Sequence, residues 1–183
     1  MAITYFGYTD ESGSGWDSGD SGYTIWNGNL VFTCPGTGLQ NVEEISCYLR
    51  LDSGSGNVRL AVYSLDGATK ICEGSSEVAV VGAGSWQGHI GAGNITPNPA
   101  QLTGGTSYKI AFTLDSNTVG PKYATGATAG DFIYKTVSDY TGGFPAALPG
   151  SPSEFSVYFS LRCGVEPAGT AFTREISDSL AIY

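Results

Sequence analysis

The chain contains little of what most enzymes use for catalysis. Its 183 residues include a single histidine, His89, and only 14% charged residues. No serine lies in a nucleophile-elbow pattern, which argues against a serine hydrolase. The four cysteines show no CxxC spacing, which argues against a structural zinc site. Most acidic residues lie in Gly/Ser-rich turns, where a catalytic carboxylate pair would not be buried. We expect a protein that is not an enzyme, with a polysaccharide-degrading enzyme as the least favoured alternative.

Clusters of basic residues and long apolar runs are also missing. Eight Lys and Arg against 17 Asp and Glu give a net charge of −9, so a nucleic-acid backbone would be repelled. No apolar run reaches bilayer-spanning length, and the N-terminal sequence MAITYFGYTDESG lacks the positive flank and apolar stretch of a signal peptide. These absences predict no nucleic-acid partner and no membrane insertion. We expect an extracellular or virion-associated protein, since a virus particle needs no signal peptide.

The strongest pattern in the sequence is the alternation of apolar and polar residues with a period of two. It predicts half-buried strands over 45–51, 58–63, 108–114 and 155–162. Weaker signals favour strands over 29–34, 69–73, 77–81, 86–90 and 132–137. Turn formers separate these runs at short intervals, and Asp66-Gly67 predicts a tight hairpin. The pattern predicts an all-β fold, an antiparallel two-sheet β-sandwich of jelly-roll type.

Composition divides the chain into three parts. An acidic Gly/Ser-rich leading segment covers 1–22, the sandwich domain covers 23–163, and a linker and C-terminal tail cover 164–183. Two connections with several prolines, 94–102 and 141–152, are expected to be loops at an end or edge of the sandwich. Loops of this length are often functional.

Two of the four cysteines are candidates for a disulfide. Cys34 and Cys163 both end strand-like runs, so this is the pair that an oxidising compartment would bridge. Cys47 lies between Ile45 and Leu49 on one face of an expected strand, which favours a small buried thiol.

Three segments in succession resemble a broad group of jelly-roll modules. They read NVRLAVYSLDGATKICEGSSEVAVVGAGSWQGHI, LTGGTSYKIAFTLDS and GDFIYKTVSDYTGGFP, and the likeness covers roughly 23–163. These modules are similar to carbohydrate-binding modules of secreted bacterial and archaeal proteins and of phage particles. The resemblance implies a noncatalytic module in a protein that contacts a polymer or a surface. It implies no defined sugar, because such modules bind through variable loops.

Aromatic residues are the main candidates for a binding site, because the C–H faces of sugar rings stack on Trp and Tyr. Trp16 lies in the acidic leading segment, where a role in the core is hard to envisage, whereas Trp86 is expected in core or edge packing. Trp26 precedes Asn27, whose amide could orient sugar hydroxyls. Alternatively, Tyr23, Ile25 or Trp26 inserts into the core as an apolar anchor of the first strand. Three tyrosines have outward parity on expected strands and would form a patch if those strands are neighbours. Such a patch could bind sugar, pack on another subunit, or reflect only the strand propensity of tyrosine on an exposed face. The predicted ligand-binding set is Trp16, Trp26, Asn27, Tyr48, Tyr63 and Tyr158.

Calcium is the ion that the leading segment could hold. Asp10, Asp17 and Asp20 lie within eleven residues amid glycines and serines, and hard cations prefer several oxygens on a flexible loop. The alternative is a solvated acidic loop without an ion. No other cofactor is expected.

Two functions follow from these observations. The first is a noncatalytic carbohydrate-binding module that recognises a polysaccharide or surface glycan through exposed aromatic residues. The alternative is a structural or adhesion protein of a virion or cell surface, which acts through subunit contacts as a homo-oligomer or within a larger multidomain protein.

Overall fold

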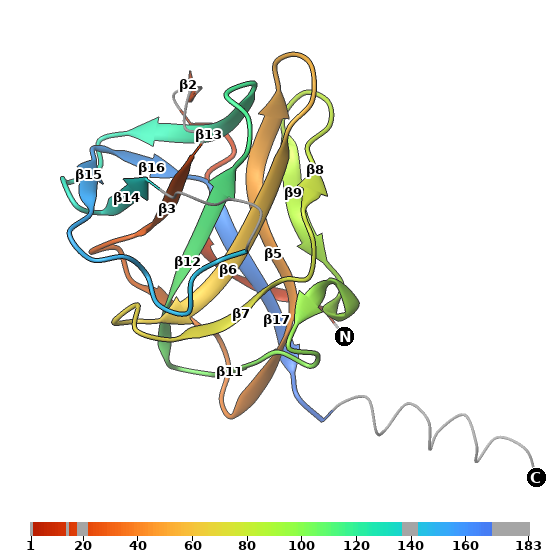
Figure 1. The fold of residues 1–183 in the computed structure, drawn as a ribbon. Coiled ribbons are helices and arrows are strands. Elements are labelled where there is room, and N and C mark those ends of the chain that lie inside the picture. The colour runs from red at the N-terminus through yellow and green to blue at the C-terminus, as the bar shows by residue number, and fades with distance from the viewer. Residues whose placement is uncertain (1, 14, 18–21, 137–142, 170–183) are drawn as a thin grey trace, which may run out of the picture.

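The fold is built from β-strands in two antiparallel sheets (Figure 1). The structure is a computed structural model that describes residues 2–13, 15–17, 22–136 and 143–169. Its one helical element is a short 3-10 turn, Ala92–Asn94, within these residues. No helix in the described part of the chain is long and apolar enough to cross a bilayer. The predicted all-β, two-sheet sandwich is confirmed, and the jelly-roll connectivity stays a prediction.

The first sheet is organised around a thirteen-residue strand, β5 (Leu39–Leu51). In order across the sheet, the main path is β1 (Thr4–Tyr8), β17 (Leu161–Pro167), β5, β13 (Val119–Thr125) and β16 (Val157–Phe159). Off this path, β2 (Gly15–Trp16) pairs with β13, while β9 (Ser85–Ile90) and β11 (Gln101–Thr103) pair with β5.

The second sheet is organised around β6 (Asn57–Ser64) and β12 (Ser107–Leu114), which pair over seven residues. Its order is β10 (Ile95–Thr96), β7 (Lys70–Gly74), β6, β12, β3 (Tyr23–Asn27), β14 (Phe132–Thr136) and β15 (Ser153–Phe155). Short strands β4 (Phe32–Thr33) and β8 (Val78–Ala79) pair with β12 and β6. The hairpin at Asp66-Gly67 joins β6 to β7, as predicted.

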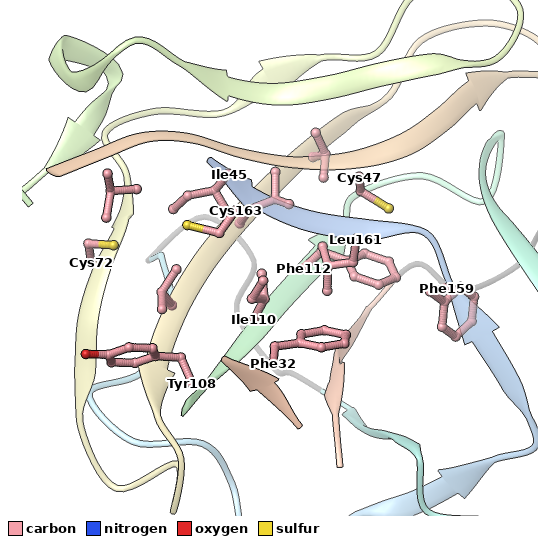
Figure 2. Packing of buried hydrophobic residues seen from close by; sticks show 14 of the residues in the cluster. Phe32, Ile45, Cys47, Cys72, Tyr108, Ile110, Phe112, Phe159, Leu161 and Cys163 are labelled. Carbon is pink, nitrogen blue, oxygen red and sulfur yellow. The ribbon is translucent and has the colours of Figure 1, made fainter. Parts of the chain in front are cut away.

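The apolar side chains on the inward-facing positions of the strongest strands form the core between the sheets, which Figure 2 shows from close by. β12 contributes Tyr108, Ile110, Phe112 and Leu114, all of them buried. The Phe112 ring meets Phe159 of the facing sheet edge-on, with centroids 5.5 Å apart. Such edge-to-face pairs add to the stabilisation that burial itself provides.

Several predicted boundaries need correction. The run expected over 155–162 is broken at Ser156 and Ser160, so that β15 lies in the second sheet while β16 and β17 lie in the first. β1 pairs with β17 along its whole length, so the sandwich begins inside the segment assigned to 1–22, and β17 continues past residue 163. The predicted tail from residue 170 onward lies outside the described residues.

The predicted disulfide between Cys34 and Cys163 is wrong for this structure. All four cysteines are free and buried. Cys163 faces the core from β17, and the Cys34 thiol donates to the Pro35 carbonyl at 3.6 Å. Burial raises the pKa of Cys34 to about 11 and raises that of Cys163 well above its usual range. Both thiols therefore pack as small apolar side chains.

A second, smaller core lies on the outer face of the second sheet. The proline-rich connection predicted as a loop covers that face, and its Phe144 packs with Trp26 and Tyr63. The Tyr63 hydroxyl donates to the Pro145 carbonyl at 2.7 Å, and the Lys70 amide donates to the Ala146 carbonyl at 2.7 Å. The loop is therefore hydrogen-bonded to the sheet as well as packed on it.

Asn27 ties three backbone segments together beneath this face. Its amide group donates to the Leu30 carbonyl at 2.7 Å and to the Tyr108 carbonyl at 3.3 Å, and its carbonyl accepts from the Ile110 amide at 2.7 Å. The side chain is fully buried. It satisfies backbone groups that would otherwise be buried without partners.

We expect Asn27→Ala to lower the free energy of unfolding by about 2 to 4 kcal/mol, because it leaves the Ile110 amide and two carbonyls unpaired. Urea denaturation followed by fluorescence measures the change. Asn29→Ala, at an exposed position two residues away, is the control and should shift the midpoint little. Equal midpoints for the two variants would contradict this role.

Candidate functional site

Four aromatic rings form a row on the outer face of the first sheet. Tyr48 of β5 is the register partner of Trp86 of β9, and Trp16 of β2 is the partner of Lys122 of β13. Tyr5 of β1 lies across β17 from these strands, next in sequence to the core residue Phe6. We call the set Tyr5, Trp16, Tyr48, Trp86, Arg50, Lys122 and Arg162 the aromatic strip.

Rings and cations contact one another in series along the aromatic strip. The Arg162 guanidinium lies 4.1 Å from the centroid of the Tyr5 ring and 4.1 Å from that of Trp86. Trp86 meets Tyr48 edge-on at 5.5 Å, and Tyr48 stacks on Trp16 at 5.9 Å. These separations are typical of favourable cation–π and aromatic pairs. The strands that carry these residues are thereby joined by one continuous series of side-chain contacts.

The Trp16 end of the strip carries two further cations. Arg50 lies 4.9 Å and Lys122 4.8 Å from the centroid of the Trp16 ring. Arg50 is also paired with Asp52 at 2.6 Å. The indole is therefore held in place by a stacked tyrosine and two positively charged side chains.

A buried carboxylate anchors the other end of the strip. Glu44 is only 4% exposed and accepts hydrogen bonds from Arg162 Nη2 at 2.8 Å and Arg162 Nε at 3.0 Å. It also accepts from the Ser46 hydroxyl at 2.5 Å and the Tyr5 hydroxyl at 3.0 Å. Burial and the hydrogen bond to this carboxylate raise the pKa of Tyr5. The two-pronged guanidinium contact suits Arg rather than Lys.

Glycines beside the strip make room for its rings. A Cβ at Gly84 would lie 2.9 Å from the Trp16 indole, and one at Gly164 would lie 2.8 Å from the Tyr5 ring. Ordinary side chains at these positions would lift the rings off the sheet. These two glycines therefore leave the space that the Trp16 and Tyr5 rings occupy.

The structure divides the predicted ligand-binding residues into two groups. Trp16 and Tyr48 lie together in the aromatic strip, half-buried. Tyr158 is half-buried and stacks on Tyr8 at 4.8 Å, in a separate pair. The remaining members, Trp26, Asn27 and Tyr63, are buried.

The predicted exposure of Trp26, Asn27 and Tyr63 is therefore wrong. Strand parity correctly places Tyr63 on the outer face of its sheet, but the loop bearing Phe144 covers that face. Trp26 is 2% exposed in the same small core, and the Asn27 amide is used entirely by backbone groups. The position of a residue in the alternation along a strand predicts which face of the sheet its side chain lies on. It does not predict whether a distant segment covers that face.

Sequence analysis missed five residues of the strip: the cations Arg50 and Lys122 beside Trp16, and Tyr5, Trp86 and Arg162. Tyr5 lies in the segment that was set apart from the sandwich, and Trp86 was expected in core or edge packing. Arg162 has outward parity on its strand, so alternation could have indicated it. Only the pairing of β1 with β17 and of β9 with β5 brings Tyr5, Trp86 and Arg162 together.

The predicted calcium ligands do not form a cluster among the described residues. The Asp10 carboxylate accepts from the Ser12 amide at 2.8 Å and the Ser12 hydroxyl at 2.6 Å, and these bonds lower the pKa of Asp10. The backbone amide of Asp17 donates to the Pro121 carbonyl. Asp20 lies outside the described residues. Within the part of the chain that the structure describes, no three His, Cys, Asp or Glu side chains are grouped to hold a metal, and calcium binding stays a prediction.

Comparison with known proteins gives no assignment for this face. No protein-family model matches the chain, and no curated protein matches it at significant similarity. The chemistry of the described residues is therefore the basis for any proposal of function.

We expect Arg162→Ala to lower the free energy of unfolding by about 3 kcal/mol or more, because it leaves the Glu44 carboxylate buried without its cation. Arg162→Lys should recover only part of this loss, since an ammonium cannot replace the planar guanidinium between two rings. Urea denaturation measures both changes. Lys135→Ala, at a lysine that donates to the Ser151 carbonyl on the surface, is the control. A loss for Arg162→Ala no larger than for the control would rule out the anchoring role.

Proposed function

We propose that the protein is a noncatalytic module that binds a polysaccharide or surface glycan through the aromatic strip. The observation that carries this proposal is the row of four aromatic rings held by glycines and cations on one sheet face. Sugar rings present apolar C–H faces that pack on Trp and Tyr rings, while polar side chains orient the hydroxyls. The family resemblance of the sequence, described above, implies the same class of function.

Polar groups that suit sugar hydroxyls lie directly beside the rings. Glu11 accepts from the Trp86 indole N–H at 2.5 Å and keeps further acceptor capacity on its exposed carboxylate. Arg50 and Lys122 flank Trp16 and can donate to hydroxyl oxygens. A ligand chain that lies along the strip would cross the strands rather than follow one of them.

The charges on the strip favour a neutral glycan. The strip holds three of the chain's eight Lys and Arg residues, but Arg162 is paired with Glu44 and Arg50 with Asp52. Glu11 adds a further negative charge, and the whole chain carries −9. A strongly acidic polymer would gain little from the paired cations and would be repelled by the rest of the surface. Binding should therefore change little with salt concentration.

We expect Trp86→Ala and Tyr48→Ala each to weaken glycan binding by about tenfold or more, since each removes a stacking surface worth more than about 1 kcal/mol. Isothermal titration against a panel of soluble polysaccharides, with calcium and again with EDTA, measures the affinity. Loss of binding in EDTA would support an ion near Trp16.

The matched control is Tyr134→Ala, because Tyr134 pairs with Tyr23 on the second sheet, away from the strip. It should leave the affinity unchanged. Unchanged affinity in both strip variants, with the folded state intact, would remove this face from glycan recognition. Failure of the whole panel to bind the native protein would contradict the proposed function itself.

A second candidate function is a subunit contact of a virion or cell-surface structural or adhesion protein. The observation that favours it is the exposed apolar surface at the Tyr5 end of the strip, where Ile3 is 36%, Tyr5 39% and Ile90 56% exposed. Tyr5 and Ile90 are separated by only β17 and β5 across the sheet. Trp, Tyr and Arg are also the residues enriched in energetic hot spots of protein interfaces. Either function fits a protein that acts outside the cell or in a virion.

If this face is a contact between copies, the native chain should oligomerise as concentration rises in sedimentation velocity. The double variant Tyr5→Ser, Ile90→Ser should then shift the equilibrium to monomer, because it removes the apolar centre of the contact. Leu65→Ser, at a residue 48% exposed elsewhere on the surface, is the control. A native chain that stays monomeric at all accessible concentrations would exclude this second function.

A further inference from the structure

A groove of about 380 Å³ lies between β8 of the second sheet and β9 of the first, away from the rings of the aromatic strip. Its wall on one side is the turn and short strand Ser76 to Ala79, and on the other side β9 near Ile90. Its size falls in the range of small-molecule sites. His89 lines it.

His89 fills a break in the second sheet beside this groove. β7 pairs with β6 at Ala61–Tyr63 and β8 pairs with it at Asn57 and Val58, which leaves Leu60 without a strand partner on that side. The Leu60 amide donates instead to His89 Nε2 at 3.3 Å. Gly74 permits this placement, because a Cβ there would lie within 1.8 Å of the imidazole.

This hydrogen bond determines the state of the other ring nitrogen. Since Nε2 accepts, the neutral imidazole carries its hydrogen on Nδ1. Burial, and then the nearby Arg59, lower the pKa of His89 to about 4, so the ring is neutral at pH 7. His89 is 1% exposed, and Nδ1 has no hydrogen-bond partner among the described residues. A buried N–H without a partner is unfavourable by about 1 to 3 kcal/mol.

The wall of the groove carries the complementary acceptor. The exposed Glu77 carboxylate lines the groove and lies 3.6 Å from Arg59 Nε, a pairing loose enough to leave oxygen lone pairs for a ligand. Ser76 adds a hydroxyl on the same wall. The lining of the groove thus includes His89, the Glu77 carboxylate and the apolar residues Val78 and Ile90.

We propose that this groove binds a small neutral molecule with adjacent hydroxyl groups, one accepting from His89 Nδ1 and another donating to Glu77. Either hydroxyl group of such a pair can serve either partner, because a hydroxyl both donates and accepts. A carbonyl offers no hydrogen to Glu77, an ammonium offers no lone pair to Nδ1, and a carboxylate is repelled by Glu77. A polyol or a monosaccharide, free or at the end of a chain, has this chemistry.

His89 Nδ1 is buried, so the lining of the groove must shift for a hydroxyl to reach it. This rearrangement limits the affinity to the millimolar range expected for a few hydrogen bonds. The site shares no ring with the aromatic strip and does not depend on glycan binding there.

The single histidine of the chain makes a direct test possible, because its imidazole signals in ¹H–¹⁵N NMR need no assignment. The folded, full-length protein is titrated with glucose, galactose, mannose, myo-inositol and glycerol. We expect a saturable shift of the His89 Nδ1 and its hydrogen with at least one of these probes. Trp86→Ala should leave that shift unchanged, which separates this site from the proposed function.

Glu77→Ala should weaken the same binding by about tenfold, since it removes one hydrogen bond to the ligand at an exposed position whose ion pair with Arg59 is loose. Glu154→Ala, at an exposed glutamate on β15, is the control and should bind as the native chain does. The absence of a saturable His89 shift with every probe would overturn the proposal, and would mean that Nδ1 is solvated by water alone. Equal affinity in Glu77→Ala and the native chain would overturn the proposed ligand chemistry.

Discussion

The register of β5 determines both the core and the candidate binding face. Because successive side chains of a strand point to opposite faces, a slip of one residue would exchange the two sets. Inward positions supply Val42, Ile45, Cys47 and Leu49, all of them fully buried. Outward positions supply Glu44, Ser46, Tyr48 and Arg50, which hold or belong to the aromatic strip. Packing of the inward side chains in the core therefore fixes the strand register, and this register brings the outward residues of several strands together in the strip.

An irregularity in this register is as important as the regular part. Between Val42 and Glu44 the pairing of β5 with β17 shifts, so that Val42 opposes Val165 and Glu44 opposes Gly164. The extra residue at position 43 puts Val42 in the core and Glu44 outside it, although both positions are even. Such a bulge redirects side chains, and this one lies next to the aromatic strip. Local alternation gives no sign of it, because it depends on the partner strand.

The sequence was sufficient to predict the main strands and the fold class, since alternation and turn formers are local signals. The sequence was insufficient to predict which aromatic residues are exposed, because a ring on an outward position can face solvent or be covered by a distant segment. Tyr48 and Tyr63 have equivalent parity, yet Tyr48 joins the strip while Tyr63 is covered by the loop bearing Phe144. Trp86 shows the converse: its role follows from pairing with Tyr48, which is distant in sequence and lies on a strand that no local pattern specifies as its partner.

The two candidate sites use the sandwich in different ways. The aromatic strip lies on a sheet face, where Gly84 and Gly164 leave room for the Trp16 and Tyr5 rings. Its two arginines are paired with Glu44 and Asp52. The groove lies where the edges of the two sheets approach each other, and there the break between β7 and β8 calls for a side chain that completes the hydrogen bonding of β6. His89 does this with one nitrogen, and the same placement forces its other nitrogen to carry a hydrogen beside the groove. The hydrogen bond that His89 Nε2 accepts at this sheet edge therefore also fixes Nδ1 as a donor. The single histidine of the chain thus has a structural role in β6 pairing and a proposed role in the groove.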